Sequence, residues 1–398
     1  MSIYDDLGVR SIINASGTLT RLGGSRMAPE VLAAMAEAAA AFVPIDGLQE
    51  RAGAVIAEIT GADAGYVVAG AAAGLALATA ACVAGLDVAK MDRLPDTTGM
   101  KDEVVVQRGH RNAYDHMIRS VGVRFVEVGY LGYPGAGGTW PWQLDAAITE
   151  RTAAVACPIL DTPGTLSLPE VVEIAHARNV PVIVDAAAEL PPRANLRRFI
   201  AEGADLVTFS GGKAIGGPQA SGILAGRADL IASVALQHQD MDVRAATWTK
   251  RPWLADGRLG GVPHQGFGRS MKIGREEIVG LVVALQRYAA GDDAQDAARW
   301  RARLARVEES LSGLPGVTLT HRFTAERPVP RLELAVDQAA LGMTAYDVVN
   351  RLFDGEPAIA VGEGRAELGT IIVDAQGLTD DEAAIVGRRL RAVLIDGA

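Results

Sequence analysis

Short apolar runs alternate with amphipathic stretches along the first two thirds of the chain. The apolar runs predict strands at residues 65–68, 103–107, 124–128, 153–159, 182–185, 205–210 and 221–225. Between them, LPEVVEIAHARN (168–179) and LRRFIAEG (196–203) have the spacing of helices. Strands that are apolar on both faces and alternate with helices are typical of a mostly parallel sheet with helices on both sides. We therefore predict an α/β fold with three layers around a seven-stranded sheet.

The pattern changes after about Pro263. A long helical stretch at 275–311 is followed by predicted strands at 317–322, 331–336, 358–361 and 370–373 and by helices at 345–353 and 380–394. This order predicts a small C-terminal α+β domain. Near the other end, MAPEVLAAMAEAAAAFV predicts a helix. We expect an N-terminal arm at 1–50, a large domain at 51–265, and a bridging helix with the small domain at 266–398.

One uncharged stretch, residues 64–86, is long enough to cross a bilayer. It is rich in alanine and glycine, and it divides into a strand (YVV), a turn (AGAAAG) and a helix (LALATAACVAG). No basic flank or aromatic belt marks a membrane boundary. We interpret it as buried structure and expect no membrane segment. The first residues, MSIYDDLGVR, lack the apolar core of a signal peptide, so we expect a cytoplasmic protein.

Composition narrows the possible partners. The 398 residues carry a formal net charge of −10, which disfavours nucleic acid as the main partner because phosphate binding needs a basic surface. The two cysteines, Cys82 and Cys157, lie in apolar runs typical of core. No CxxC pair or Cys/His cluster is present, so we expect no metal site.

Two chemical candidates follow strands of the same predicted sheet. Asp185 ends VIVD, where an acid is costly unless it is paired. It either caps the next segment or holds a protonated ring nitrogen. Lys213 stands in FSGGKAIGGPQASG (209–222) and is either a surface lysine in a turn or a Schiff-base lysine. Lysine suits the second role because desolvation readily removes its proton, and the glycines around it would let a flat cofactor approach.

A third candidate is the turn in VVAGAAAGLALA. Here Gly70, Ala71 and Ala72 lead from a strand into a helix, whose free N–H groups suit a phosphate, although small residues before a helix are common. Ser210, before the lysine turn, would add a hydroxyl. A phosphate cradle, an acid for a ring nitrogen and a lysine together predict pyridoxal 5'-phosphate (PLP) as cofactor.

Two loops add candidates with open alternatives. His110 in QRGHRNAYDH follows a strand and either stacks on the cofactor ring or is an ordinary loop histidine. Asp161 and Thr162 in LDTPGTLSLPE follow another strand and could reach the ring hydroxyl or the substrate. A Pro-Gly turn explains the second loop almost as well.

A basic segment, HQGFGRSMKIGREE (264–277), is the candidate for binding an anionic end of the substrate. Arg269, Lys272 and Arg275 could meet a carboxylate or phosphate, with arginine able to do so through two parallel hydrogen bonds. The alternative is a solvated helix start with Arg/Glu pairs. Arg365, in the small domain, is a second carboxylate candidate.

At this point the chain resembles a known group. HRN, PGTL, VDAAAE and FSGGKAIGGP, in this order, resemble fold-type I PLP enzymes of the aminotransferase class V kind. IINASGTLTRLGGS, LPDTTGMKDEVVVQRGHRNAYDH and SGGKAIGGPQASGIL more closely resemble the branch that contains bacterial selenocysteine synthase and D-glucosaminate-6-phosphate ammonia-lyase. The resemblance runs from about residue 10 to 395. It implies a homodimer or larger even-numbered assembly with active sites at subunit interfaces. It also implies that Lys213 bonds the cofactor, Asp185 meets the ring nitrogen and His110 lies over the ring.

The chain departs from this pattern at three places. Selenocysteine synthase carries an extra N-terminal domain for tRNA, whereas INASGT stands here within the first twenty residues. We therefore expect no tRNA substrate. Ala69 stands where relatives often have serine or threonine before the first glycine of the phosphate turn. Asp374-Ala375-Gln376 replaces an Asp-Pro-Arg-like turn, which puts substrate identity in doubt.

The resemblance implies α,β-elimination, which converts a small polar amino acid or amino-sugar acid into a 2-oxo acid and ammonia. Lys213 is expected to act as the general base for the α-proton. A racemase, aldolase or transferase that uses the same lysine is the alternative. A non-catalytic PLP-binding regulator is a remoter one, because no DNA-binding module or basic tail is visible.

Overall fold

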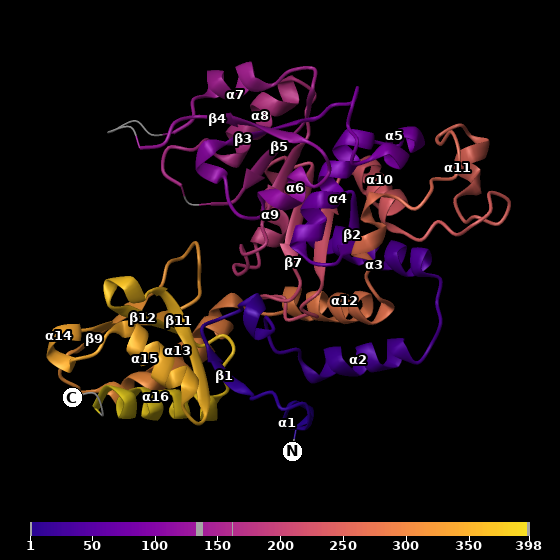
Figure 1. Cartoon of the computed structure of the whole chain (residues 1–398). Coiled ribbons are helices and arrows are strands. Elements are labelled where there is room, and N and C mark those ends of the chain that lie inside the picture. The colour runs from indigo at the N-terminus through magenta and orange to yellow at the C-terminus, as the bar shows by residue number, and fades with distance from the viewer. Residues whose placement is uncertain (1, 133–137, 161, 396–398) are drawn as a thin grey trace. The chain divides into compact units, whose positions relative to one another are not determined.

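The computed structural model describes residues 2–132, 138–160 and 162–395 and divides into two compact units (Figure 1). The larger unit contains residues 27–190 and 194–290, and the smaller one contains 1–26, 191–193 and 291–398. These limits differ from the boundaries expected after residues 50 and 265. The reason is that helices α2 (Pro29–Ala39) and α12 (Arg275–Ala289) pack against each other and belong to the larger unit.

The larger unit is built on a seven-stranded sheet. Its strands are β2 (Ala64–Val68), β3 (Glu103–Gln107), β4 (Arg124–Val128), β5 (Thr152–Pro158), β6 (Val182–Asp185), β7 (Leu206–Ser210) and β8 (Gly222–Gly226). Their order is β2-β8-β7-β6-β5-β3-β4, and only β8 runs against its neighbours. The prediction of a mostly parallel seven-stranded sheet is confirmed.

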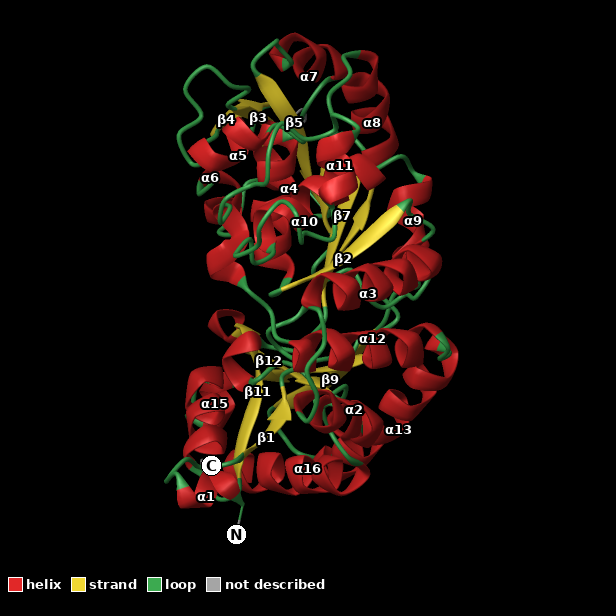
Figure 2. Ribbon diagram, turned by 90° about the vertical axis from the view of Figure 1, so that its right-hand side faces the viewer, coloured by secondary structure: helices red, strands yellow, loops and turns green. Residues whose placement is uncertain are grey.

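Helices cover both faces of this sheet (Figure 2). One face packs against α2, α12, α3 (Ile45–Thr60), α7 (Pro141–Ala147), α8 (Leu168–Ala177) and α9 (Asn195–Ala201). The other packs against α4 (Ala71–Ala84), α5 (Val88–Arg93), α6 (Asp115–Arg119) and α10 (Ala228–His238). A short helix, α11 (Arg251–Ala255), follows in the segment after α10. Successive strand residues point to opposite faces, so Val104 joins one core and Val105 the other.

The uncharged stretch at 64–86 forms strand β2 and the buried helix α4, as predicted. In the described part of the chain, no helix is both long and apolar enough to cross a membrane.

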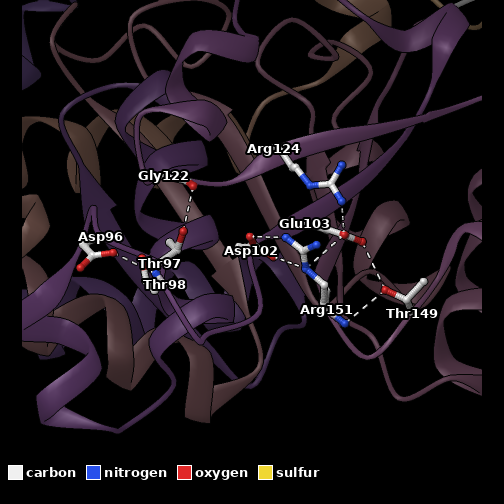
Figure 3. Close-up of polar contacts among 9 residues, drawn as sticks. All are labelled: Asp96, Thr97, Thr98, Asp102, Glu103, Gly122, Arg124, Thr149 and Arg151. Atoms are coloured by element: carbon white, nitrogen blue, oxygen red, sulfur yellow. Dashed lines mark hydrogen bonds and ion pairs between the residues drawn. The ribbon is translucent and has the colours of Figure 1, made fainter.

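A polar network fastens the amino-terminal edge of the sheet (Figure 3). Glu103 opens β3 with a buried side chain and accepts hydrogen bonds from Arg124 at 2.5 Å and from the Thr149 hydroxyl at 3.2 Å. Arg151 donates two hydrogen bonds to Asp102, at 2.9 and 2.6 Å, and these bonds lower the pKa of the Asp102 carboxyl. The starts of β3, β4 and β5 are thereby aligned, and their other ends meet at the opposite edge.

The smaller unit contains a five-stranded sheet. Its order is β1 (Ile12–Ala15), β11 (Ala358–Arg365), β12 (Thr370–Asp374), β10 (Arg331–Val336) and β9 (Val317–Arg322). The helices of this unit are α1 (Ile3–Asp6), α13 (Asp293–Leu311), α14 (Gln338–Leu341), α15 (Ala345–Asp354) and α16 (Asp380–Ile395). The predicted helix at 275–311 is in fact two helices. α12 ends at Ala289, and the Asp292 carboxylate caps the start of α13 by accepting from the Gln295 N–H.

Candidate active site

The carboxyl edge of the larger sheet gathers the predicted chemical residues. Asp185 ends β6, Ser210 ends β7, and His110 lies in the turn directly after β3. Because β3, β6 and β7 run in the same direction, their last residues lie along one edge. His110, which lies 75 positions before Asp185 and 100 before Ser210, is therefore brought to the same side of the sheet as both.

Asp185 is partly buried, and its surroundings alter its acidity. Its Oδ1 accepts a hydrogen bond from the Ala187 N–H at 3.0 Å. Burial raises the pKa of the carboxyl, while the Ala187 N–H and the positive charge of Lys213 act in the opposite direction. The two residues chosen from the sequence thus interact electrostatically. Asp185 also lines a small hollow together with Leu75 and Asn112.

Lys213 lies in a turn whose glycines allow close packing against the segment that follows. The Gly211 N–H donates to the Ser221 carbonyl at 2.8 Å, and a Cβ on Gly211 would lie 2.3 Å from the Ser221 Oγ. A Cβ on Gly212 would lie 2.5 Å from the Cα of Gln219. Clearance for a flat cofactor was the expected reason for these glycines. The structure gives a different reason for Gly211 and Gly212, because the turn folds tightly onto the segment that follows it.

The turn into α4 has the features of an anion cradle. Gly70 begins the helix at φ 91° and no side chain caps it. The first helical hydrogen bond runs from the Gly74 N–H to the Gly70 carbonyl, so the N–H groups of Ala71 and Ala72 have no partner within the helix. Gly222 of β8 approaches closely, since a Cβ there would lie 2.8 Å from the Gly70 carbonyl carbon. The cradle therefore depends on backbone donors, as the alanine at position 69 suggested.

His110 is buried beside this edge with one ring nitrogen unsatisfied. Its Nδ1 makes no hydrogen bond within the described part of the chain, and burial lowers the pKa of the ring. Such an atom is costly unless a ligand or water meets it. Asn112 holds the loop, because its amide donates to the His110 carbonyl and its oxygen accepts from the Tyr114 N–H. A neutral, fixed imidazole and an unpaired nitrogen fit a bound ring system.

Thr162 supports the histidine turn. Its hydroxyl donates to the Gly109 carbonyl at 3.0 Å, and a Cβ on Gly109 would lie 2.8 Å from the Thr162 Cγ2. Asp161 lies outside the described residues. Ser210 pairs with Gly222 in the sheet and directly precedes the lysine turn.

One supporting residue escaped the sequence analysis. The buried side chain of Gln107 makes two hydrogen bonds with the backbone of Leu166, at 3.0 and 2.7 Å. It thereby fixes the end of β3 against the Thr162 loop. An amide at the end of the apolar run VVVQ was the available signal, but nothing in the spacing pointed to residue 166.

The basic segment lies elsewhere in the larger unit. The short 3-10 helix η3 (Phe267–Met271) carries Arg269, whose guanidinium donates to Asp240 at 2.9 Å, and Lys272 follows it. Both side chains line a cavity of about 510 Å³, and the residues that line it do not include Lys213 or Asp185. The lining of this cavity therefore gives no contact between the basic segment and the lysine turn.

The other two arginine candidates have structural partners. Arg275 donates to the carbonyls of Ala38 and Ala39 at the end of α2, so it acts as a helix cap. Arg365 lies in the smaller unit, where it forms an ion pair of 2.7 Å with Glu333. Glu333 is also paired with Arg322 at 3.0 Å.

Comparison with known proteins agrees with this arrangement. Residues 12–245 match the family model described as L-seryl-tRNA selenium transferase (SelA). The chain belongs to this family. It is 37% identical over 400 residues to D-glucosaminate-6-phosphate ammonia lyase of Salmonella typhimurium, with 98% of each chain covered. It is also 35% identical over 403 residues to 5'-C-glycyluridine monooxygenase-decarboxylase of a Streptomyces species, with 99% of this chain and 92% of the relative covered.

A solved structure extends the family match to three dimensions. That of D-glucosaminate-6-phosphate ammonia-lyase superposes with a TM-score of 0.82 at 36% identity, covering 100% of this chain and 99% of the other. The resemblance predicted from the motifs and the predicted fold class are both confirmed. The SelA family match covers the α4 turn, the His110 turn and the lysine turn, all of which fall within residues 12–245.

Proposed function

We propose that the protein is a PLP-dependent ammonia lyase that acts on a small polar amino acid or amino-sugar acid. One observation carries the proposal: burial raises the pKa of the partly buried Asp185 and the charge of Lys213 opposes this rise, at the sheet edge where α4 offers N–H groups with no partner in the helix. The 37% identity to an ammonia lyase, which extends over 98% of both chains, supports the reaction class. We keep a cytoplasmic homodimer as part of the proposal.

The chain's own residues fit the cofactor. The N–H groups of Ala71 and Ala72 would hold its phosphate, Asp185 its ring nitrogen and His110 the face of its ring. Ser210 and Thr162 would lie beside the bound cofactor. When bound, PLP supplies an aldehyde for the amino group of the substrate and a ring that withdraws electrons from the neighbouring carbon.

Each site residue has a definite task. Asp185, whose carboxyl pKa burial raises, would be stabilised as a carboxylate by the protonated ring nitrogen of bound PLP and would hold that proton in place. The Lys213 amine accepts the proton from the α-carbon and passes one to the departing β-substituent. His110, kept neutral by burial, covers the site without adding charge.

The atoms of the reaction balance without an oxidant. The α-C–H bond and the bond to the β-substituent break, and water then replaces nitrogen to give a 2-oxo acid and ammonia. If the β-substituent is hydroxyl, one water leaves and one is consumed. The second relative is named as a monooxygenase-decarboxylase, so oxygen-dependent decarboxylation is the competing reaction to be tested.

We also propose that Arg269 and Lys272 bind an anionic end of the substrate. The residues that line their cavity do not include Lys213, and we propose that a partner chain supplies the two cations to the site. The name of the 37% identical relative includes a 6-phosphate. A phosphorylated amino-sugar acid therefore agrees with a pair of cations, and D-glucosaminate 6-phosphate is the first compound to test.

The cofactor assignment is tested with Lys213→Ala. We expect the purified protein to show the visible absorbance of bound PLP and to form a covalent adduct on borohydride reduction, which the variant should lose. Lys101→Ala, a change in an exposed lysine, serves as the control and should keep the adduct. A wild-type protein that takes up no PLP would refute the whole assignment.

The reaction is tested by a screen of D- and L-amino acids and phosphorylated amino-sugar acids, with and without air. Release of ammonia and a 2-oxo acid in equal amounts under argon is the expected result. Ammonia or carbon dioxide that appears only with oxygen would favour the decarboxylase reaction. Racemisation or retro-aldol cleavage without ammonia would favour the alternative expected from the sequence.

A further inference from the structure

Two buried polar side chains form part of the cavity wall that also contains Arg269 and Lys272. The Tyr66 hydroxyl lies 2.9 Å from the His238 Nδ1, and the His238 Nε2 lies 2.9 Å from the Met271 carbonyl. Tyr66 lies in β2, His238 ends α10, and Met271 ends η3. A chain of two hydrogen bonds therefore connects the edge strand of the sheet to the turn that carries Arg269.

The proton positions in this chain follow from the acceptor at its end. A carbonyl oxygen only accepts, so the His238 Nε2 must carry the proton that it shares with Met271. Burial lowers the pKa of His238, and the charge of Arg269 lowers it further, so the ring is neutral. Its Nδ1 must then accept, and the Tyr66 hydroxyl donates. Burial also raises the pKa of Tyr66, which keeps the hydroxyl protonated.

A second connection holds the side chain of Arg269 from the same segment. Asp240, two residues after His238, accepts from the Arg269 guanidinium at 2.9 Å and from the Gln265 amide at 3.2 Å. Gln265 also accepts from the Met241 N–H at 3.2 Å. The end of α10 thus holds both the backbone of η3 and its arginine.

Close packing leaves η3 little room to move. A Cβ on Gly266 would lie 2.7 Å from the Gln237 Cα, and a Cβ on Gly268 would lie 2.4 Å from the Leu77 Cδ2. Two glycines therefore let the turn sit directly against α10 and α4. In such a contact, loss of the hydrogen bond from His238 to Met271 would leave a partly buried carbonyl without its partner.

We infer that Tyr66 and His238 are positioning residues that hold η3, so that Arg269 and Lys272 meet the anionic end of the substrate. The inference rests on the proposed role of these two cations. It goes beyond that role because it assigns substrate affinity to a tyrosine–histidine pair that acts through the position of η3. The pair holds η3 through two hydrogen bonds whose protons stay in place, and it does not exchange protons with the substrate.

The test compares His238→Leu, His238→Gln and Tyr66→Phe in the full-length PLP-loaded protein. Amide hydrogen exchange, followed by mass spectrometry, is measured for a peptide that covers 264–273. We expect exchange to rise about tenfold in His238→Leu and by less in Tyr66→Phe. His238→Gln, which keeps an N–H donor near the Nε2 position, should restore protection. His176→Leu is the matched control, because it removes a histidine paired with Asp205 and should leave this peptide unchanged.

Kinetics with D-glucosaminate 6-phosphate give the second readout. His238→Leu should raise KM about tenfold while kcat changes less than about threefold. Unchanged exchange at 264–273 in His238→Leu, or a fall in kcat at constant KM, would overturn the inference. If His238→Leu does not fold, the same outcomes are decided with Tyr66→Phe.

The failure of the underlying proposal would look different. If Arg269→Ala leaves KM unchanged, the proposed role of Arg269 is wrong, and the inferred positioning for substrate is wrong with it. If Arg269→Ala raises KM but His238→Leu changes neither exchange nor KM, only the inferred positioning role of Tyr66 and His238 is wrong. If D-glucosaminate 6-phosphate is not turned over, the proposed substrate fails, and the exchange of 264–273 still decides whether the pair holds η3.

Discussion

At the scale of single residues, Asp185 shows that a partly buried functional carboxyl lowers the free energy of unfolding. Burial disfavours its charged form, and the Ala187 N–H and Lys213 offset this only in part, since the net effect is a raised pKa. A group of this kind makes the empty protein less stable at neutral pH. The same feature suits a positive partner, which recovers the lost interaction when it binds.

Asp185→Asn should therefore stabilise the cofactor-free protein. Because the folded protein holds the Asp185 proton more tightly than the unfolded chain, the free energy of unfolding falls as pH rises from about 3.9, the usual aspartate value, toward the raised pKa. The variant loses this fall, so we expect a higher urea midpoint than wild type at pH 7 and convergence near pH 3.

Asp102→Asn is the control of opposite sign, because Arg151 lowers the pKa of Asp102 in the folded state. That variant should be less stable than wild type at pH 7. Equal midpoints for Asp185→Asn and wild type at pH 7 would contradict the assigned cost. With PLP present, Asp185→Asn should bind the cofactor more weakly and lose activity.

Gly222→Ala tests the cradle at a single atom. The added Cβ would meet the backbone of Gly70 at 2.8 Å and of Ala71 at 2.9 Å, and backbone cannot rotate away as a side chain can. We expect PLP affinity to fall about tenfold and the free energy of unfolding to fall by about 1–3 kcal/mol. Fluorescence titration with PLP and urea unfolding measure the two effects. Gly260→Ala, which meets no atom within 4 Å, should change neither.

At the scale of elements, the two edges of the large sheet have separate tasks. The amino-terminal edge is fastened by Glu103 with Arg124 and Arg151, and the carboxyl edge carries Asp185 and the lysine turn. Changes at the first edge should affect stability without affecting the chemistry. This separation follows from the common direction of the parallel strands.

Glu103→Gln tests that separation. The variant keeps the size of a buried side chain but loses the charge that Arg124 and Arg151 meet, so the free energy of unfolding should fall by about 1–3 kcal/mol. PLP affinity and kcat should stay within about twofold of wild type. Urea unfolding and PLP titration measure the two properties, and a tenfold loss of PLP affinity would show that the edges are coupled.

Element boundaries were predictable where local chemistry marks them. The strands at 103–107, 124–128, 182–185, 317–322 and 331–336 have the predicted limits. β1 was not predicted, and it forms by pairing with β11, which lies almost 350 positions later in the chain. The break between α12 and α13 was missed although Gly291 and the Asp292 cap mark it locally, because the two helices are separated by only three residues.

At the scale of the whole molecule, the lysine turn and the basic segment raise the question of assembly. Arg269 and Lys272 line a cavity that does not include Lys213, although both groups are proposed to serve one substrate. In a symmetric dimer, the basic segment of each chain could complete the site at Lys213 of the other chain.

Subunit complementation tests this arrangement. At a substrate concentration well below KM, Lys213→Ala should be inactive and Arg269→Ala nearly so. Co-refolding them in equal amounts should then restore about a quarter of wild-type activity, because half of the dimers would hold one intact site. No recovery in verified mixed dimers would show that Lys213 and Arg269 act within the same chain. Mixing Lys213→Ala with Lys213→Arg is the control, since no intact site can form.

The sequence by itself determined the order of the strands and most helices of the larger unit and the residues that follow the strands. Apolar periodicity reports local structure, and the common direction of parallel strands then brings Asp185, Ser210 and His110 to one edge. For this reason the sequence alone singles out Lys213 and Asp185. The motif resemblance, now supported by the family match, had the same origin.

Only the tertiary structure decided contacts between residues that no local spacing connects. Tyr66 meets His238 across 172 positions, and Gln107 meets Leu166 across 59. The packing of Gly211 against Ser221 could not be predicted either, because a glycine in a sequence does not indicate which residue packs against it. Distant side chains meet according to how the sheet and helices pack, and packing depends on all the contacts of the folded chain at once.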